Sequence, residues 1–171
     1  VALGESSFSR YESHFGVDAL RRLLAKFWKI VAVSENIKRR CVDRYSVDVN
    51  QIETFSNAPD TSRFFPRPKA GMRRKLGLPS DRIIVGFVGA FNENKGPQRI
   101  LKAIEPRPDI GAVFIGSGPL NIRGPQVLAA RPVPHNAIPD WLSAVDIYVQ
   151  PVFAEGSSNS MLEAVACGLP I

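Results

Sequence analysis

Residues 83–115 read IIVGFVGAFNENKGPQRILKAIEPRPDIGAVFI, and this stretch decides the fold. The apolar run Ile83–Val88 predicts a buried strand, and the Gly/Asn-rich loop after it leads into a helix at Pro97–Ile104. A second apolar run, Ala112–Ile115, follows that helix and predicts another strand. Alternation of strand and helix is the pattern of a parallel sheet with helices on both faces.

Further strands and helices are predicted on both sides of this stretch. Upstream they are a helix near Val17–Trp28, a strand at Ile30–Val33, a helix from the Ser34 cap to about Arg44, a weaker strand at Gln51–Phe55 and a short helix over Gly71–Leu76 that ends at Gly77. Downstream they are a helix at Ile138–Ser143 and a strand at Ile147–Val149. The predicted fold class is therefore α/β, with parallel sheets flanked by helices. A linker at Phe65–Pro68 separates two predicted domains, 1–66 and 67–171.

Composition places the chain among globular proteins, because 44% of its 171 residues are hydrophobic and 22% are charged. Its two cysteines, Cys41 and Cys167, make no disulfide framework, and we expect free thiols in a reducing compartment. No signal peptide opens the chain and no apolar run is long enough to cross a bilayer, so a cytoplasmic location is expected. Val1–Leu3 reads as the end of a strand and Gly168–Ile171 as the start of another, which predicts a piece of a longer protein, cut on both sides.

The net charge of +6 favours anionic partners such as phosphorylated substrates, an acidic membrane surface or nucleic acid. Most of the basic residues stand in helical segments whose other positions are apolar, so nucleic acid is not an expected partner. The basic amphipathic helix near Val17–Lys29 leaves two alternatives open. It either lies peripherally on the inner face of an anionic membrane, or packs its Leu/Phe stripe on its own sheet.

Three loops are candidates for a ligand site, because the ligands of open parallel sheets bind at the carboxyl ends of the strands. These loops are Gly89–Gly96, Gly116–Pro119 and the turn that begins at Glu155, and each follows a predicted strand. Gly116-x-Gly118 is a poor dinucleotide fingerprint, since Asn121 holds the position of its third glycine. By itself that segment predicts only a tight turn.

The turn at Glu155 is the most informative of the three loops. Residues 155–168 read EGSSNSMLEAVACG, in which Glu155 and Glu163 bracket a polar segment that opens a short helix. Free N–H groups at a helix start bind anions, and carboxylates accept hydrogen bonds from hydroxyl groups, so the turn has the chemical outline of a nucleotide-sugar site. Two simpler interpretations stay open: Ser160-x-x-Glu163 is a capping box, or Glu155 is a solvated loop carboxylate.

Taken in order, these segments resemble family-four (group one) glycosyltransferases with the GT-B fold. The resemblance to their C-terminal domain is carried by Phe87–Gly89, Lys95-Gly96, Phe114–Pro119, Ile138–Ile147, Pro151, Glu155-Gly156, Glu163 and Ala166–Pro170, and the resemblance to the end of their N-terminal domain by Ala32–Ser34, Asn57–Asp60, Phe64 and Pro66. It implies two Rossmann-like domains truncated at both ends. Residues 1–66 would be the end of the acceptor-side domain with the interdomain crossing, and 67–171 most of the nucleotide-sugar-binding domain.

The resemblance also implies roles for individual residues. Lys95 would place a cation on the donor diphosphate and Glu155 would bind the transferred sugar, and these two are the implied catalytic residues. Glu163 would accept hydrogen bonds from the ribose hydroxyls. Val133 and His135 would lie near the base, with no catalytic task for His135. The other implied donor-binding residues are Gly89, Gly116, Ser117, Gly118, Gly156, Ser157, Ser158 and Asn159.

The implied reaction is transfer of a sugar from a nucleotide-diphosphate sugar to a saccharide or lipid-linked acceptor, with retention of configuration, in cell-surface polysaccharide or glycolipid synthesis. No cofactor is expected, and the absence of an Asp-x-Asp pair agrees with transfer that needs no metal. The chain departs from the family at Ala90, where arginine is frequent, and at Arg131-Pro132, where glycine is common. A non-catalytic nucleotide-sugar-binding module or degenerate subunit therefore stays open as an alternative, and we expect this piece alone to be inactive. A GT-B sugar-nucleotide epimerase is a third possibility, although such an enzyme is expected to lack the turn in which Glu155 and Glu163 stand eight positions apart.

Overall fold

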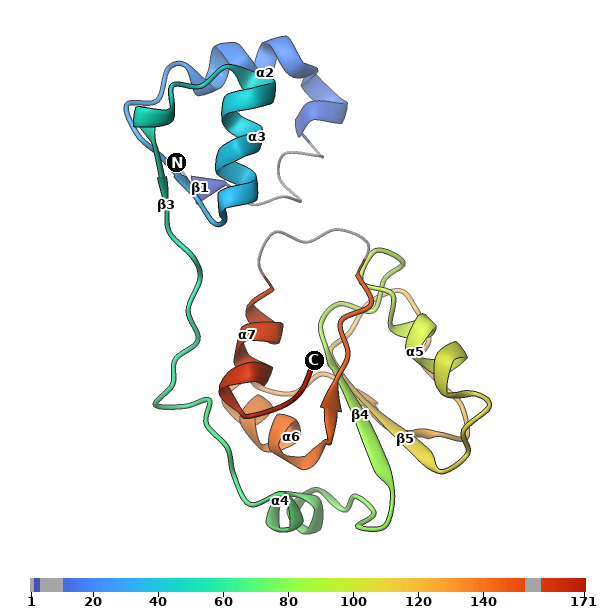
Figure 1. Ribbon diagram of the computed structural model, residues 1–171. Coiled ribbons are helices and arrows are strands. Elements are labelled where there is room, and N and C mark those ends of the chain that lie inside the picture. The colour runs from blue at the N-terminus through green and yellow to red at the C-terminus, as the bar shows by residue number, and fades with distance from the viewer. Residues whose placement is uncertain (1, 4–10, 153–157) are drawn as a thin grey trace. The chain divides into compact units, whose positions relative to one another are not determined.

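The computed structural model describes residues 2–3, 11–152 and 158–171. The chain forms two compact units (Figure 1): of the described residues, the first contains 2–3, 11–58 and 158, and the second contains 59–152 and 159–171. Each unit contains its own parallel sheet. The parallel α/β pattern predicted from the sequence is therefore confirmed.

The first unit has, within the described residues, a three-stranded parallel sheet in the order β1 (Ala2–Leu3), β2 (Ile30–Ala32) and β3 (Ile52–Thr54). A single 3₁₀ turn, η1 (Val49–Gln51), leads into β3. The helices α2 (Val17–Leu24) and α3 (Glu35–Tyr45) pack on this sheet. The buried core of the unit consists of Leu20, Leu24, Ile30, Ala32, Ile37, Cys41, Tyr45, Val47 and Ile52.

The start of α3 agrees with the sequence prediction, whereas the end of α2 differs from it. The Ser34 hydroxyl accepts a hydrogen bond from the Ile37 amide at 3.3 Å, so Ser34 caps α3 as predicted. Helix α2 ends at Leu24, four residues before the predicted end at Trp28, whose side chain is 87% exposed. Leu20 and Leu24 lie in the core, as expected for the alternative in which this helix packs on its own sheet, whereas Leu23 is 51% exposed.

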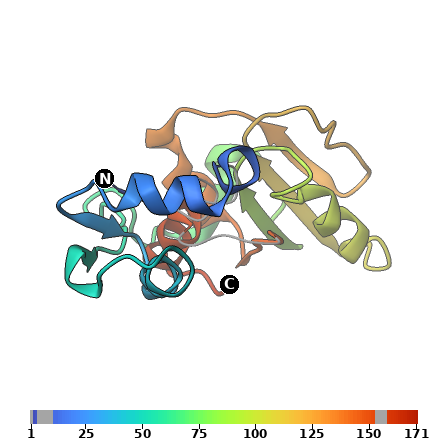
Figure 2. The ribbon, with the colours of Figure 1, turned by 90° about the horizontal axis from the view of Figure 1, so that it is seen from above.

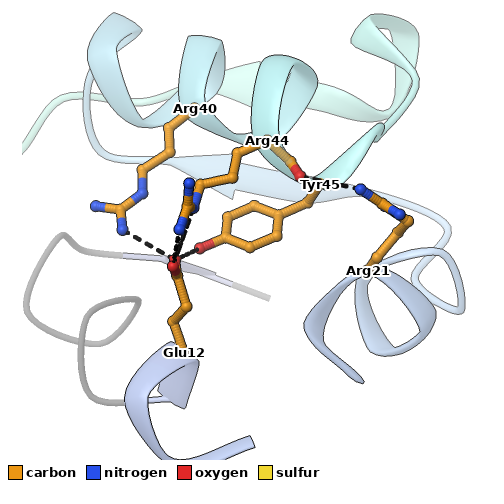
Figure 3. Close-up of polar contacts among 5 residues, drawn as sticks. All are labelled: Glu12, Arg21, Arg40, Arg44 and Tyr45. Carbon is orange, nitrogen blue, oxygen red and sulfur yellow. Dashed lines mark hydrogen bonds and ion pairs between the residues drawn. The ribbon is translucent and has the colours of Figure 1, made fainter. Parts of the chain in front are cut away.

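A carboxylate near the start of the described chain joins the helical residues 11–15 to α3 (Figure 3). Glu12, in the helical residues 11–15, accepts hydrogen bonds from Arg40 at 3.2 Å, from Arg44 Nε at 3.0 Å and from the Tyr45 hydroxyl. Arg21 of α2 donates to the carbonyl of Arg44 at 3.4 Å. The basic residues on this side of α3 thus serve contacts within the unit.

We predict that Glu12→Gln removes an acid-sensitive part of the stability of this unit. Hydrogen bonds from Arg44, Tyr45 and Arg40 lower the pKa of Glu12 from 4.5 to about 2. A lowered pKa in the folded state adds stability above the unfolded value, and this is lost as the pH falls from about 4.5 toward 2. Urea midpoints at pH 6, 4 and 2.5 should show a smaller fall for Glu12→Gln than for the unchanged protein. Equal falls in the two proteins would contradict the role given to Glu12.

The second unit has a four-stranded parallel sheet in the described residues, in the order β6 (Val127–Arg131), β5 (Ile110–Ile115), β4 (Ile83–Val88) and β7 (Ile147–Tyr148). The bounds of β4 are those predicted, whereas β6 was not predicted at all. It is an edge strand, and its Ala130 and Arg131 are exposed, so it shows neither a continuous apolar run nor regular alternation.

Helices cover both faces of this sheet (Figures 1 and 2). On one face, α5 (Pro97–Ile104) packs Ile100 and Ile104 against Phe87 and Phe114. On the other face lie α4 (Lys69–Leu76), α6 (Ile138–Ala144) and α7 (Asn159–Ala166), with the turn η2 (His135–Ala137) before α6. Phe64, from the segment predicted to cross between domains, is buried in the core of this second face.

Four basic residues of this unit are paired with two aspartates. Asp140 of α6 forms ion pairs with Arg67 and with Lys75, the latter at 2.6 Å. Asp146 pairs with Lys69 at 2.7 Å and with the buried Arg73 at 2.5 Å. These ion pairs therefore join α4 and the segment before it to α6 and to Asp146 between α6 and β7. Within the described residues no helix is both long and apolar enough to span a bilayer.

Candidate functional site

A pocket of about 350 Å³ opens at the carboxyl ends of β4 and β5. The described residues that line it come from the ends of β4 and β5, from the loops after β4, β5 and β6, and from the start of α6: Val88, Gly89, Ala90, Ile115, Gly116, Ser117, Pro132, Val133 and Ile138. Four predicted donor-binding residues, Gly89, Gly116, Ser117 and Val133, thus line one cavity. Its position is the one at which parallel sheets bind their ligands.

Two residues that line this pocket, Gly89 and Gly116, bring their main chains into close contact. A Cβ atom on Gly116 would lie 1.9 Å from the carbonyl oxygen of Gly89, and the φ angle of Gly116 is +150°. The Gly89 amide donates to the carbonyl of Ile115 at 3.0 Å, and the Gly116 amide to that of Arg131 at 3.0 Å. Only glycine at position 116 lets the loops after β4 and β5 approach this closely.

Gly118 serves the same contact between loops. A Cβ atom there would lie 2.4 Å from the carbonyl oxygen of Phe91. The Phe91 amide donates to the carbonyl of Ser117 at 2.8 Å, and the Leu120 amide donates to that of Phe91 at 3.0 Å. The two loops therefore form one continuous surface, and Gly118 packs within it.

The loop after β4 ends in a turn that sets the position of Lys95. The Asn92 side chain accepts a hydrogen bond from the Lys95 amide at 2.9 Å, and the Asn92 carbonyl accepts one from the Gly96 amide at 2.9 Å. Gly96 has a φ of +67°, and Pro97 begins α5. Lys95 is half-buried at this helix start and is not among the described residues that line the pocket.

Glu163 is held by a histidine. The residue is 9% exposed, and its Oε1 lies 2.9 Å from Nε2 of His135. Nδ1 of His135 lies 3.3 Å from Nη1 of Arg63. Because a guanidinium can only donate, Nδ1 must accept, and the neutral ring then carries its proton on Nε2 and donates to Glu163. The Phe64 ring packs against the imidazole, with 5.4 Å between the ring centroids.

The capping-box interpretation of Ser160 and Glu163 is wrong. Helix α7 begins at Asn159, so Ser160 is its second residue and does not precede the helix. The Ser160 hydroxyl instead accepts from the Tyr148 hydroxyl at 2.9 Å, and Glu163 contacts His135. The fully buried Tyr148, which sequence reasoning missed, also lies 3.3 Å from the carbonyl of Val88, and so links the end of β4 to the start of α7.

Of the predicted site residues in the turn before α7, the structure describes only some. Glu155, Gly156 and Ser157 lie outside the described residues. Ser158 is buried directly before α7, and Asn159 is exposed as its first residue. Over the described ranges there is no group of three or more His, Cys, Asp or Glu that could hold a metal ion. Transfer without a metal therefore stays a prediction.

The parallel four-stranded sheet, the helices on its two faces and the pocket at its strand ends define the second unit as a Rossmann-like α/β domain. Residues 82–171 match the model of one protein family, described as "Glycosyl transferases group 1". The chain belongs to this family, and the resemblance inferred from its motifs is confirmed.

Individual relatives agree with this assignment. The chain is 28% identical to a D-inositol 3-phosphate glycosyltransferase from Thermobispora bispora over 166 residues, which are 84% of this chain and 39% of that protein. It is 28% identical to the putative teichuronic acid biosynthesis glycosyltransferase TuaC of Bacillus subtilis, over 90% of this chain and 40% of that one. The chain thus spans about two fifths of the length of these relatives.

A solved structure shows the same fold. HepE of Anabaena, in complex with UDP-glucose, matches with a TM-score of 0.82 at 17% identity, over 99% of this chain and 51% of that one. The present fold therefore corresponds to part of a GT-B glycosyltransferase. Of the two Rossmann-like domains that we predicted, the structure shows one, because the first unit has only three short strands among its described residues.

Proposed function

We propose that the protein of which this chain is part transfers a sugar from a nucleotide-diphosphate sugar to a saccharide or lipid-linked acceptor, with retention of configuration. The observation that carries the proposal is that Gly89, Gly116, Ser117 and Val133 line one pocket in the domain that matches the family. The HepE structure with UDP-glucose supports a nucleotide-sugar donor, and the TuaC relative supports a role in polysaccharide synthesis.

The donor would be held by groups from three loops. Lys95 would pair with the diphosphate, together with the amides at the start of α7. Glu163 would bind the ribose: His135 occupies one of its carboxylate oxygens, and the other would accept from a hydroxyl. Val133 and His135 would lie near the base, and Glu155 would accept hydrogen bonds from the transferred sugar.

The chemistry needs little from acid or base side chains. The bond from the anomeric carbon to the leaving phosphate oxygen breaks, while the acceptor oxygen bonds to that carbon on the same face. The acceptor proton passes to an oxygen of the leaving diphosphate. The protein's task is then to stabilise the charge that grows on the diphosphate, which a fixed cation and a helix start can do.

We further infer that the first unit is the end of an acceptor-side domain. Its parallel strands alternate with helices, as in a Rossmann-like domain, and the chain covers about two fifths of its relatives. The acceptor would then contact residues outside this chain as well, which is why we expect the chain alone to be inactive.

The proposal is tested by incubating the full-length protein with labelled UDP-glucose, GDP-mannose or ADP-glucose and with saccharide or lipid acceptors. We expect a labelled product whose anomeric proton coupling matches that of the donor. Inverted product would contradict retention. Binding of a donor without transfer would favour the alternative, a non-catalytic module, for which Ala90 in place of the frequent arginine is the specific observation.

We predict that Glu155→Ala lowers the transfer rate about a hundredfold, because a hydrogen-bond acceptor aligned on the sugar is lost at the reacting carbon. Donor consumption by purified full-length protein is the measurement. The matched control is Glu105→Ala, at the exposed end of α5, which should transfer at the unchanged rate. An unchanged rate in Glu155→Ala would remove that residue from the site.

A further inference from the structure

The side chain of Arg99 joins the two loops that leave neighbouring strands of the second unit. Arg99 lies in the first turn of α5, four residues after Lys95. Its Nη2 donates to the carbonyl of Glu93 at 2.8 Å, and its Nη1 donates to the carbonyl of Pro151 at 2.5 Å. Glu93 belongs to the loop after β4 and Pro151 to the segment after β7, and β4 pairs directly with β7.

This bridge begins where the backbone pairing of the two strands ends. The Val149 amide donates to the carbonyl of Gly86 at 2.9 Å, next to the paired residues Gly86 and Tyr148. Pro151 has no N–H group with which to extend such pairing. The planar guanidinium can hold two carbonyls in fixed directions, which an ammonium group cannot do. Arg99 therefore continues the connection between the two strands beyond their last backbone bond.

The space for the bridge is provided by Gly96. A Cβ atom on Gly96 would lie 2.1 Å from Nη1 of Arg99 and 2.8 Å from the carbonyl oxygen of Pro151. The Gly96 carbonyl also accepts from the Arg99 amide at 2.9 Å. The absence of a side chain directly after Lys95 thus lets the guanidinium reach both loops.

We propose that Arg99 is a positioning residue for Lys95. By holding the loop after β4 against the segment after β7, it fixes the turn from which the Lys95 ammonium reaches the donor diphosphate. The guanidinium of Arg99 donates to the backbone carbonyls of Glu93 and Pro151, and through these contacts it would act on the donor by way of Lys95. This inference rests on the proposed function, in which Lys95 is the cation on the diphosphate.

A double-mutant cycle in the full-length protein tests the coupling. Dissociation constants for UDP-glucose, GDP-mannose and ADP-glucose are measured by calorimetry for the unchanged protein, Arg99→Met, Lys95→Met and the double variant. For the probe that binds, we expect Arg99→Met to weaken binding about tenfold in the unchanged background and less than about twofold in the Lys95→Met background. Equal weakening in both backgrounds, or none in either, would overturn the proposal.

A second measurement needs no ligand. In ligand-free Arg99→Met, we expect amide hydrogen exchange to rise about tenfold in residues 92–96 and in the amides of 148–152, with the centre of β5 unchanged. Unchanged exchange in both segments would overturn the bridge itself. Arg107→Met is the matched control. Arg107 is exposed, and within the described residues its guanidinium contacts only Asp109. A full-length protein that binds none of the three probes would contradict the proposed function. The hydrogen-exchange result would still show whether Arg99 holds the two segments together.

Discussion

Lys95→Met should lower kcat/KM for the donor about a thousandfold in the full-length protein. Removing one group that stabilises developing charge in an active site costs a factor of about 10² to 10³. We expect the upper end here, since position 90 holds alanine and no arginine occurs from Gly89 to Lys95. The substitution keeps the backbone amide that bonds to Asn92, so the turn should survive.

Steady-state kinetics with the donor identified by the transfer assay provide the measurement. Lys102→Met is the matched control, because Lys102 is exposed in the same helix region and should leave kcat/KM unchanged. A fall of less than about threefold in Lys95→Met, with folding intact by circular dichroism, would show that another group carries the diphosphate charge.

Gly116→Ala should both destabilise the second unit and weaken binding of the donor. The new methyl group would lie 1.9 Å from a backbone oxygen that cannot turn aside, at a φ of +150° that side chains rarely adopt. We expect the free energy of unfolding to fall by about 4 kcal/mol, from backbone strain and the clash together.

Gly124→Ala separates these two contributions. Gly124 has a similar φ of +158°, but its nearest neighbour is a Val127 methyl group at 3.9 Å. This control should lose only about 2 kcal/mol, the cost of the strain, and should keep its affinity for the donor. Urea unfolding and calorimetry compare the two variants. Equal losses would mean that the loops after β4 and β5 can move apart without penalty.

Elements with a continuous local signal were predictable from the sequence. The run Ile83–Val88 and the helix Pro97–Ile104 have the bounds that the structure gives to β4 and α5, since apolar runs and the Gly96-Pro97 start mark them. Edge strand β6 was missed because its exposed half carries no pattern. The predicted extension of α2 to Trp28 failed because the apolar spacing continues past the point where the helix ends.

The positions of site residues that directly follow a strand were predictable from the sequence. Contacts between side chains that are far apart in the sequence were not. Gly89 and Gly116 follow predicted strands, so their place at one sheet edge could be inferred. The contact of His135 with Glu163 joins residues 28 positions apart, and that of Arg99 with Pro151 residues 52 apart. Sequence spacing does not predict contacts between residues so far apart in the chain. The packing of α6, α7 and α5 on the sheet brings these side chains together.

The contact between Gly116 and Gly89 divides the pocket into two kinds of surface. Next to β4 and β5 the lining includes Gly89 and Gly116, which have no side chains and whose main chains are in close contact. A second wall includes Pro132 and Val133, which follow β6, and Ile138, which begins α6, and these residues lie outside the strands. A lineage could therefore alter which ligand it accepts by substitutions on that wall alone, while the scaffold beneath stays constant.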